Sequence, residues 1–154
     1  MRLILAFAGA ALAPAGALTL WYLYGQFATF DAGDPYIWVR TRGFGILCLA
    51  VSTVCVFVLG VPAYLALRGR PALRWWGAWL AGFFLAAIPF TLLTFPGLSA
   101  EFVAADGVQL IVDGVPTFAG WVNYLGGVAL FGACGTLAAA TFWAVGGMGS
   151  KRSR

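Results

Sequence analysis

The residues of this chain whose types could do chemistry are few. The chain has 154 residues, of which five are acidic and none is histidine. Two of the acids, Asp31 and Asp34, lie in the segment Phe-Asp-Ala-Gly-Asp-Pro. Paired carboxylates can run acid and base chemistry when their environments separate their pKa values, but Asp beside Gly and Pro also forms turns for local reasons. We expect Asp31 and Asp34 to form a turn and to take no part in catalysis.

Two arginines, Arg40 and Arg42, follow this turn and stand just before an apolar stretch. Three interpretations stay open. The arginines could pair with Asp31 and Asp34, meet an anionic lipid headgroup, ligand or partner, or anchor the chain in the membrane interface through their long stems. An exposed ion pair contributes only about 0 to 1 kcal/mol, so stability alone does not explain both arginines. These four side chains form the polar part of our candidate binding site.

The three cysteines do not indicate a metal centre. Cys48, Cys55 and Cys134 all fall inside apolar stretches, and none belongs to a Cys-x-x-Cys pair. No histidine is present to complete a metal-binding set or to ligate haem. We predict thiols that pack as small hydrophobic groups, with no metal and no cofactor.

The segment 96–120 is the other candidate for function. We expect Ser99 to begin a short helical turn that ends at Ala105. Val108–Val112 is predicted to be a strand, and Asp113–Gly114 is a strong hairpin signal. Pro116 would confine the returning strand to a sheet edge.

This segment is too apolar to be a free aqueous loop. It would pack over the helices as a cap, dip into the membrane interface, or bind a partner by strand addition. Val108, Leu110 and Val112 alternate along the predicted strand. They form the apolar part of our candidate binding site.

The composition of the chain indicates whether these residues belong to a soluble protein or to a membrane protein. Apolar residues make up 62% of the chain and charged residues 9%, against about 25% charged in an average soluble domain. Four stretches contain no charged residue: 3–24, 43–67, 75–95 and 121–145. Each is long enough to cross a membrane, which takes about 20 residues, and in lipid each must be helical to pair its backbone groups. We therefore expect residues 1–154 to form a single domain, an all-α integral membrane protein. Its fold would be a four-transmembrane-helix bundle with a small extracytoplasmic loop subdomain that contains a short β-hairpin.

The basic residues orient the four stretches, because Lys and Arg favour the cytoplasmic side of short loops. Most of them would share one side: Arg2, Arg68, Arg70, Arg74, Lys151, Arg152 and Arg154. This pattern predicts an inner loop at 68–74, a cytoplasmic tail at 146–154 and outer loops at 25–42 and 96–120. Both termini are then expected in the cytoplasm, and the positions of Trp and Tyr near the ends of the stretches agree.

The first stretch has a second interpretation as a cleaved signal peptide. Arg2 and the pattern Ala15-Gly16-Ala17 fit one loosely. The apolar run continues as far as Tyr24, beyond any cleavage point, and this favours a retained helix.

Prolines and small residues describe how the helices would pack. Pro14, Pro62 and Pro89 each remove a backbone donor and tend to kink a helix, and we expect Thr91 and Thr94 to compensate near Pro89. Small residues recur four apart in three stretches: Gly9, Ala13 and Ala17; Ala78, Gly82 and Ala86; Gly132, Thr136 and Ala140. Such spacing lets helix backbones approach closely. It would close the bundle on itself or, alternatively, recruit a partner helix.

The lack of Asp, Glu, Lys, Arg and His in the four stretches limits the function. Proton relays, ion-coupled carriers and voltage sensors keep such residues within the membrane. Basic residues placed as a topology signal also argue against nucleic-acid binding. A small Ala- and Arg-rich chain with four spans is typical of the inner membrane of bacteria.

Our first hypothesis is a non-enzymatic, multi-pass protein of that membrane. It would act through a membrane or extracytoplasmic protein partner, as an accessory subunit or an immunity-type protein. The alternative is a small oligomeric transporter or channel for an uncharged or lipid-like solute. A third hypothesis is an enzyme acting on lipid through the acids of the outer loops. The sequence predicts no oligomeric state.

Overall fold

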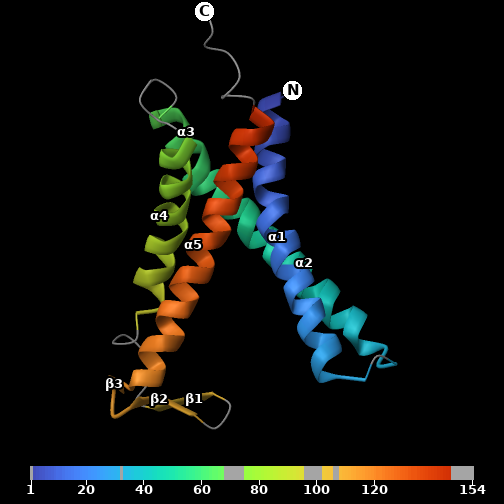
Figure 1. Ribbon diagram of the computed structural model, residues 1–154, viewed down its shortest axis with the longest axis vertical. Helices are drawn as coiled ribbons and strands as arrows, with labels where there is room; N and C mark the ends of the chain where they lie inside the picture. The colour runs from blue at the N-terminus through green and yellow to red at the C-terminus, as the bar shows by residue number, and fades with distance from the viewer. Residues whose placement is uncertain (1, 32, 68–74, 96–101, 106–107, 147–154) are drawn as a thin grey trace, which may run out of the picture.

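Long helices make up most of the molecule (Figure 1). The computed structural model describes residues 2–31, 33–67, 75–95, 102–105 and 108–146. The helical elements are α1 (Arg2–Thr29), α2 (Tyr36–Cys55), the π-helical turn η1 (Val56–Gly60), α3 (Val61–Leu67), α4 (Trp75–Leu93) and α5 (Phe118–Gly146). Because α2, η1 and α3 follow one another without a break, they form one continuous rod.

Within the described ranges, four helices are long and apolar enough to cross a membrane: Arg2–Thr29, Tyr36–Leu65, Trp76–Leu93 and Phe118–Gly146. A helix satisfies its backbone hydrogen bonds within itself, which a membrane-crossing segment requires. The prediction of a mainly helical protein with four helices long and apolar enough to span a membrane is confirmed. A small antiparallel sheet accompanies the helices.

Most of these helices extend beyond the stretches that the sequence predicts. α1 has 28 residues and α5 has 29, which gives lengths of about 42 to 44 Å at about 1.5 Å per residue. A hydrocarbon core is only about 30 Å thick, so the helix ends would reach into the headgroup regions. α2 begins at Tyr36, so Arg40 and Arg42 lie in its first two turns rather than in an outer loop. Between α1 and α2, the connecting segment is much shorter than the predicted loop 25–42.

α4 and α5 pack closely through small residues. A Cβ atom added at Gly82 would lie 2.6 Å from the Cβ of Ala139, and one added at Gly135 would lie 2.6 Å from the Cβ of Ala86. Only glycine at both positions allows the two backbones to approach this closely. The small residues of the third and fourth stretches thus make a contact within the chain. Gly82 and Ala86 belong to the predicted stripe, whereas Gly135 and Ala139, which meet them, each lie one position before a residue of the stripe predicted in the fourth stretch.

α1 and α5 meet near the start of α1. A Cβ atom added at Gly9 would lie 3.2 Å from a methyl group of Thr141. The ring centroid of Phe7 lies 4.8 Å from that of Phe142 and 6.0 Å from that of Tyr64 in α3. These three aromatic rings join α1, α3 and α5 at the same end of the molecule.

α1 and α2 form an antiparallel hairpin held by aromatic pairs. The rings of Tyr22 and Phe44 are stacked with their centroids 4.3 Å apart. Phe27 meets Trp38 edge to face at 6.1 Å. Stacked and edge-to-face aromatic pairs both add to the free energy of burial, and here they hold the hairpin in register.

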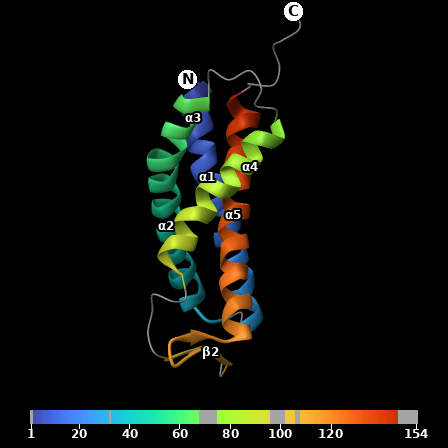
Figure 2. The same ribbon diagram turned by 90° about the vertical axis from the view of Figure 1, so that its left-hand side faces the viewer.

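The two helical hairpins diverge toward the end that carries the sheet. The main contacts between long helices join α2 to α1, α1 to α5 and α5 to α4, which makes an open row. Figure 1 shows the lower ends of α1 and α5 far apart, and Figure 2 shows the molecule from the side. No atom of another helix lies within 4 Å of a Cβ added at Gly16 or Gly126. The bundle is therefore packed at one end and open at the other.

The three prolines have different effects. Pro14 and Pro89 lie inside α1 and α4, which continue through them. Ahead of Pro62 the chain forms the π-helical turn η1, in which the Val61 N–H donates to the Val56 carbonyl. The expected compensation at Pro89 is wrong, because Thr91 and Thr94 donate to the carbonyls of Ala87 and Phe90, not to that of Leu85 four residues before the proline.

The sheet lies across the end of α5 (Figures 1 and 2). Its strand order is β1 (Phe102–Ala105), β2 (Val108–Val112) and β3 (Val115–Pro116), with antiparallel neighbours. β2 covers the strand that the sequence predicts, and β3 is an edge strand, as Pro116 requires. Asp113 and Gly114 both have positive φ angles, of 50° and 75°, as a tight hairpin turn needs.

One local prediction in this segment is wrong. The expected helical turn ending at Ala105 is strand β1, whose backbone pairs with β2 from Phe102↔Val112 to Ala105↔Val108. Pairing with a neighbouring strand satisfies more backbone groups than a single helical turn can. Ser99, where the turn was expected to begin, lies outside the described residues.

Candidate functional site

The segment between α1 and α2 is a turn built by its two aspartates. Asp31 accepts a hydrogen bond from the Gly33 N–H at 3.4 Å through its side chain, and its carbonyl accepts one from the Asp34 N–H at 2.9 Å. Asp34 accepts from the Tyr36 N–H at 2.9 Å and so caps the start of α2. Both carboxylates therefore have local structural roles, as the turn interpretation predicts.

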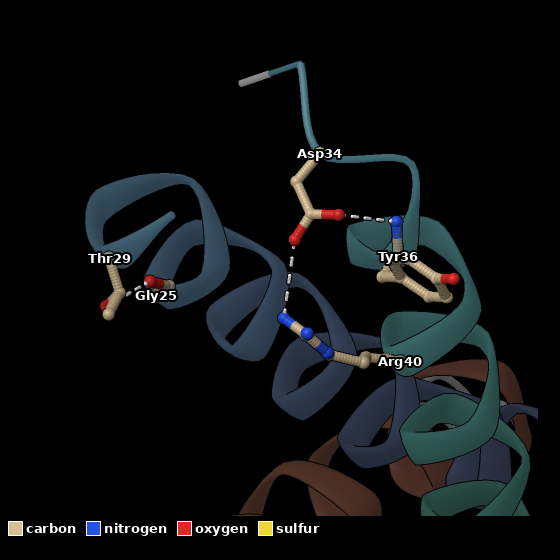
Figure 3. A network of polar contacts seen from close by, with 5 residues as sticks. All are labelled: Gly25, Thr29, Asp34, Tyr36 and Arg40. Carbon is tan, nitrogen blue, oxygen red and sulfur yellow. Dashed lines mark hydrogen bonds and ion pairs between the residues drawn. The ribbon is translucent and has the colours of Figure 1, made fainter. Parts of the chain in front are cut away.

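Arg40 completes this turn (Figure 3). Its guanidinium lies 3.6 Å from the other carboxylate oxygen of Asp34, and the two side chains are 41% and 23% exposed. The same guanidinium lies 4.6 Å from the ring centroid of Phe30, in cation–π distance. The proposed pairing of arginine with aspartate thus holds for Arg40 and Asp34.

Arg42 lies on a different side of α2. Within the part of the chain that the structure describes, it forms no ion pair and no side-chain hydrogen bond. It is exposed on the same face as Trp38, Val39 and Ile46. The four polar candidate residues are therefore not one cluster: Asp31, Asp34 and Arg40 make the turn, and Arg42 stands apart.

Two buried polar atoms near this turn were not identified from the sequence. Thr41 is only 6% exposed, and its hydroxyl oxygen has no hydrogen-bond partner among the residues that the structure describes. The side-chain oxygen of Gln26 in α1 is also buried without a partner. A buried polar atom left unpaired costs about 1 to 3 kcal/mol. No sequence signal marks these residues, because threonine and glutamine at a helix end are ordinary.

The sheet is fastened to α5 by Thr117. Its N–H donates to the Leu110 carbonyl at 2.9 Å, and its hydroxyl donates to the Gln109 carbonyl at 2.7 Å. The same hydroxyl accepts from the Gly120 N–H at 3.1 Å, which caps α5. A Cβ at Gly120 would overlap the Leu110 carbonyl, so the close approach requires glycine.

Val108, Leu110 and Val112 lie along β2, with Val108 exposed and the other two half-buried. Ile111 is buried instead. β2 pairs with β1 on one side and with β3 and Thr117 on the other. Its backbone is therefore occupied, and the outer edge of β1 has no strand neighbour among the described residues.

Apolar side chains are exposed where the sheet meets α5. Phe118 is 86% exposed and Val115 is 66% exposed. Just beyond them, the rings of Phe95, Trp121 and Tyr124 contact one another edge to face. Aromatic rings of this kind are enriched at membrane interfaces, so this end of α5 has the character of an interfacial region.

One side of α5 is exposed along four positions. Val122, Gly126, Ala129 and Ala133 are all exposed. At 3.6 residues per turn they share one side of the helix, opposite the glycines that meet α4. Three of the four are small, so this side is a shallow stripe.

A groove of about 370 Å³ runs between α1 and the end of α2. Its lining is almost entirely apolar and includes Phe7, Leu12, Leu49, Thr53 and Phe57. The only polar side chain in it, Thr53, donates its hydroxyl to the carbonyl of Leu49. The groove can accommodate a hydrocarbon chain and offers no group for chemistry.

The described carboxylates do not converge. Asp31 and Asp34 lie in the turn between α1 and α2, whereas Asp113 lies in the hairpin turn of the sheet. Among the described residues, no three Cys, Asp or Glu side chains gather as a metal site would require. Glu101 and Asp106, the other acids of the enzyme hypothesis, lie outside the described residues.

The fold and these surfaces define a class, a multi-pass helical membrane protein with a small sheet at one end. The chain matches no protein-family model, no curated protein and no solved structure at a significant level.

Proposed function

We propose that this chain is a non-enzymatic membrane protein that acts by binding another membrane protein through α5. The carrying observation is the exposed stripe of Val122, Gly126, Ala129 and Ala133. Between helices in lipid, association depends on close packing rather than on hydrophobic burial, so small residues favour a partner helix. Larger side chains would serve equally well against lipid.

Other features agree with such a role. The open end between the two hairpins leaves Trp21, Tyr24 and Leu125 largely exposed. Together with Phe118 and Val115, they give a partner a broad apolar surface at the sheet end. A partner with an extracytoplasmic part could also use the outer edge of β1. The role would be that of an accessory subunit or an immunity-type protein.

We further propose the bacterial inner membrane as the location, with both termini in the cytoplasm. The start of α1 and the end of α5 lie at one end of the molecule, and the sheet lies at the other (Figure 1). Seven of the nine basic residues belong to the proposed cytoplasmic side, in agreement with the preference of Lys and Arg.

In-cell photocrosslinking tests the proposed contact. A photoreactive residue at Ala129 should capture a second protein, whereas one at Leu92, exposed on α4, should not. Replacing Gly126 and Ala133 by leucine should reduce the partner recovered with the tagged chain in mild detergent. Recovery of the chain alone, with no product from Ala129, would contradict the subunit role. The immunity role needs a separate toxin challenge, because its partner comes from outside the cell.

A second candidate is an oligomeric carrier or channel for a lipid-like solute. The apolar groove between α1 and α2 favours it. Flux of fluorescent lipid in reconstituted vesicles distinguishes the two functions. A monomeric protein that moves no solute would exclude the carrier.

A further inference from the structure

Arg42 is a charged group without an ion-pair partner among the described residues. Arg40, two residues before it, is held by Asp34 and by the ring of Phe30. Arg42 has no such contact in the described part of the chain, and it is exposed. It therefore faces the surroundings of α2 with its charge unneutralised.

The surroundings of Arg42 are a membrane boundary. The uncharged stretch of α2 starts at the next residue, Gly43. Phe44, one residue further, is stacked on Tyr22 of α1. Trp38 is one turn earlier on the same face and is 63% exposed. Aromatic rings of this kind mark the headgroup level, so Arg42 lies where hydrocarbon gives way to headgroups.

The direction of the side chain follows from the helix. In an α-helix the Cα–Cβ bond tilts toward the N-terminus. The N-terminus of α2 is at the end of the molecule with the turn and the sheet (Figure 1). The tilt therefore directs the Cα–Cβ bond of Arg42 toward this end, and from there a long basic side chain can extend to the headgroups.

Phosphate is the headgroup component that fits this arrangement. A guanidinium presents donors in a planar fork that binds two phosphate oxygens at once. The indole of Trp38 adds a donor four residues away, on the same face, and its ring is held edge to face against Phe27. We propose that Arg42, with Trp38, binds the phosphate of a phospholipid in the leaflet at the sheet end. The site does not depend on the proposed protein partner.

Lipid titration of the purified full chain tests this site. Protein stripped of lipid in an uncharged detergent would be titrated with phosphatidylglycerol, and bound lipid counted by native mass spectrometry. We expect Arg42→Gln to weaken binding about five-fold, since one basic residue near an anionic surface contributes about that factor. Arg40→Gln is the matched control and should bind like the wild type. Diacylglycerol with the same chains, which lacks phosphate, should not distinguish the variants.

Several results would overturn the proposal. It fails if Arg42→Gln binds like the wild type, or if Arg40→Gln loses as much. Displacement of the lipid by millimolar inorganic phosphate would show that the ligand is a free anion. If Arg42→Gln does not give a monodisperse protein, lipid binding by Arg42→Lys is measured instead. Lysine keeps the charge without the fork, so it should bind more weakly than arginine, and equal binding would refute the site.

Discussion

Arg40 and Arg42 have different surroundings although they are two residues apart. Two positions along a helix differ by about 200° in direction, so only one of them can face the turn. The sequence predicts that these residues matter together but not which one faces Asp34. That choice depends on where α2 begins, and the capping contact between Asp34 and the Tyr36 N–H fixes the start of the helix.

The carboxylate of Asp34 has two roles that substitution can separate. Asp34→Asn keeps an oxygen for the Tyr36 N–H and loses the charge. Because the ion pair with Arg40 is partly exposed, its loss should change the free energy of unfolding by less than about 1 kcal/mol. Asp34→Ala also loses the cap, so it should cost about 1 kcal/mol more. Unfolding by denaturant in detergent micelles measures both, and a larger loss for Asn than for Ala would contradict this division.

Thr41 carries a buried hydroxyl without a partner. Thr41→Val replaces that hydroxyl by a methyl group of similar size and removes the unpaired polar atom. The free energy of unfolding should rise by up to about 1 kcal/mol. Thr53→Val is the control, because the Thr53 hydroxyl is exposed and bonded to Leu49, and it should have little effect. A melting temperature lowered by Thr41→Val would show that the hydroxyl has a partner in the membrane.

The elements differ in how strongly their sequences specify their contacts. The predicted stripe of α4 includes Gly82 and Ala86, which meet α5, whereas the residues of α5 that meet them, Gly135 and Ala139, lie outside the stripe predicted there. The strand β2, its turn and its edge partner follow from Asp113, Gly114 and Pro116. Strand β1 could not be predicted, since a short Ala-containing segment has no periodicity of its own and pairs only because β2 is adjacent.

Two glycines of α5 allow a matched comparison. Gly135→Ala places a methyl group against Ala86 and the backbone of Gly82. It should destabilise the protein by about 1 to 3 kcal/mol through overpacking. Gly126→Ala meets no neighbouring atom and should be neutral or stabilise by up to about 1 kcal/mol, because alanine favours the helix. Unfolding in mixed micelles measures the difference, and equal effects would contradict the α4–α5 packing.

Thr117 joins the sheet to α5 through one hydroxyl. Thr117→Val removes both its donated and its accepted hydrogen bond and should cost about 1 to 2 kcal/mol as a lost cap. Hydrogen exchange of the β2 amides should become faster. Thr117→Ser keeps the hydroxyl and should exchange like the wild type. Unchanged exchange in Thr117→Val would show that the hydroxyl is not needed and that the bond from the Thr117 N–H to the Leu110 carbonyl, with side-chain packing, holds the sheet.

The arrangement of the whole molecule follows from the sequence only in part. Hydropathy predicts four spans, but it does not distinguish one side of an apolar helix from another. The open row of helices and the divergence of the two hairpins could therefore not be predicted. The same limit applies to the proposed binding surface on α5, because its exposed side is defined only by how α4 and α1 pack against that helix.

The proposed orientation predicts which positions are reached from outside the cell. In a chain whose three native cysteines are replaced by alanine, Gly33→Cys in the turn before α2 should react with a membrane-impermeant thiol reagent in intact cells. Ser150→Cys near the C-terminus should react only after lysis. Labelling of Ser150→Cys in intact cells would show that the orientation is the opposite one, with the sheet in the cytoplasm.

The π-helical turn η1 (Val56–Gly60) changes the direction in which the side chains of α3 point around the helix axis. The Val61 N–H bonds five residues back rather than four, so the helix after it is rotated by about 100° relative to a regular continuation. That rotation is what aims the Tyr64 ring at Phe7 and Phe142. If the same residues formed a regular α-helix, the Tyr64 ring would turn away from Phe7 and Phe142, so the junction of three helices depends on this one π-helical turn.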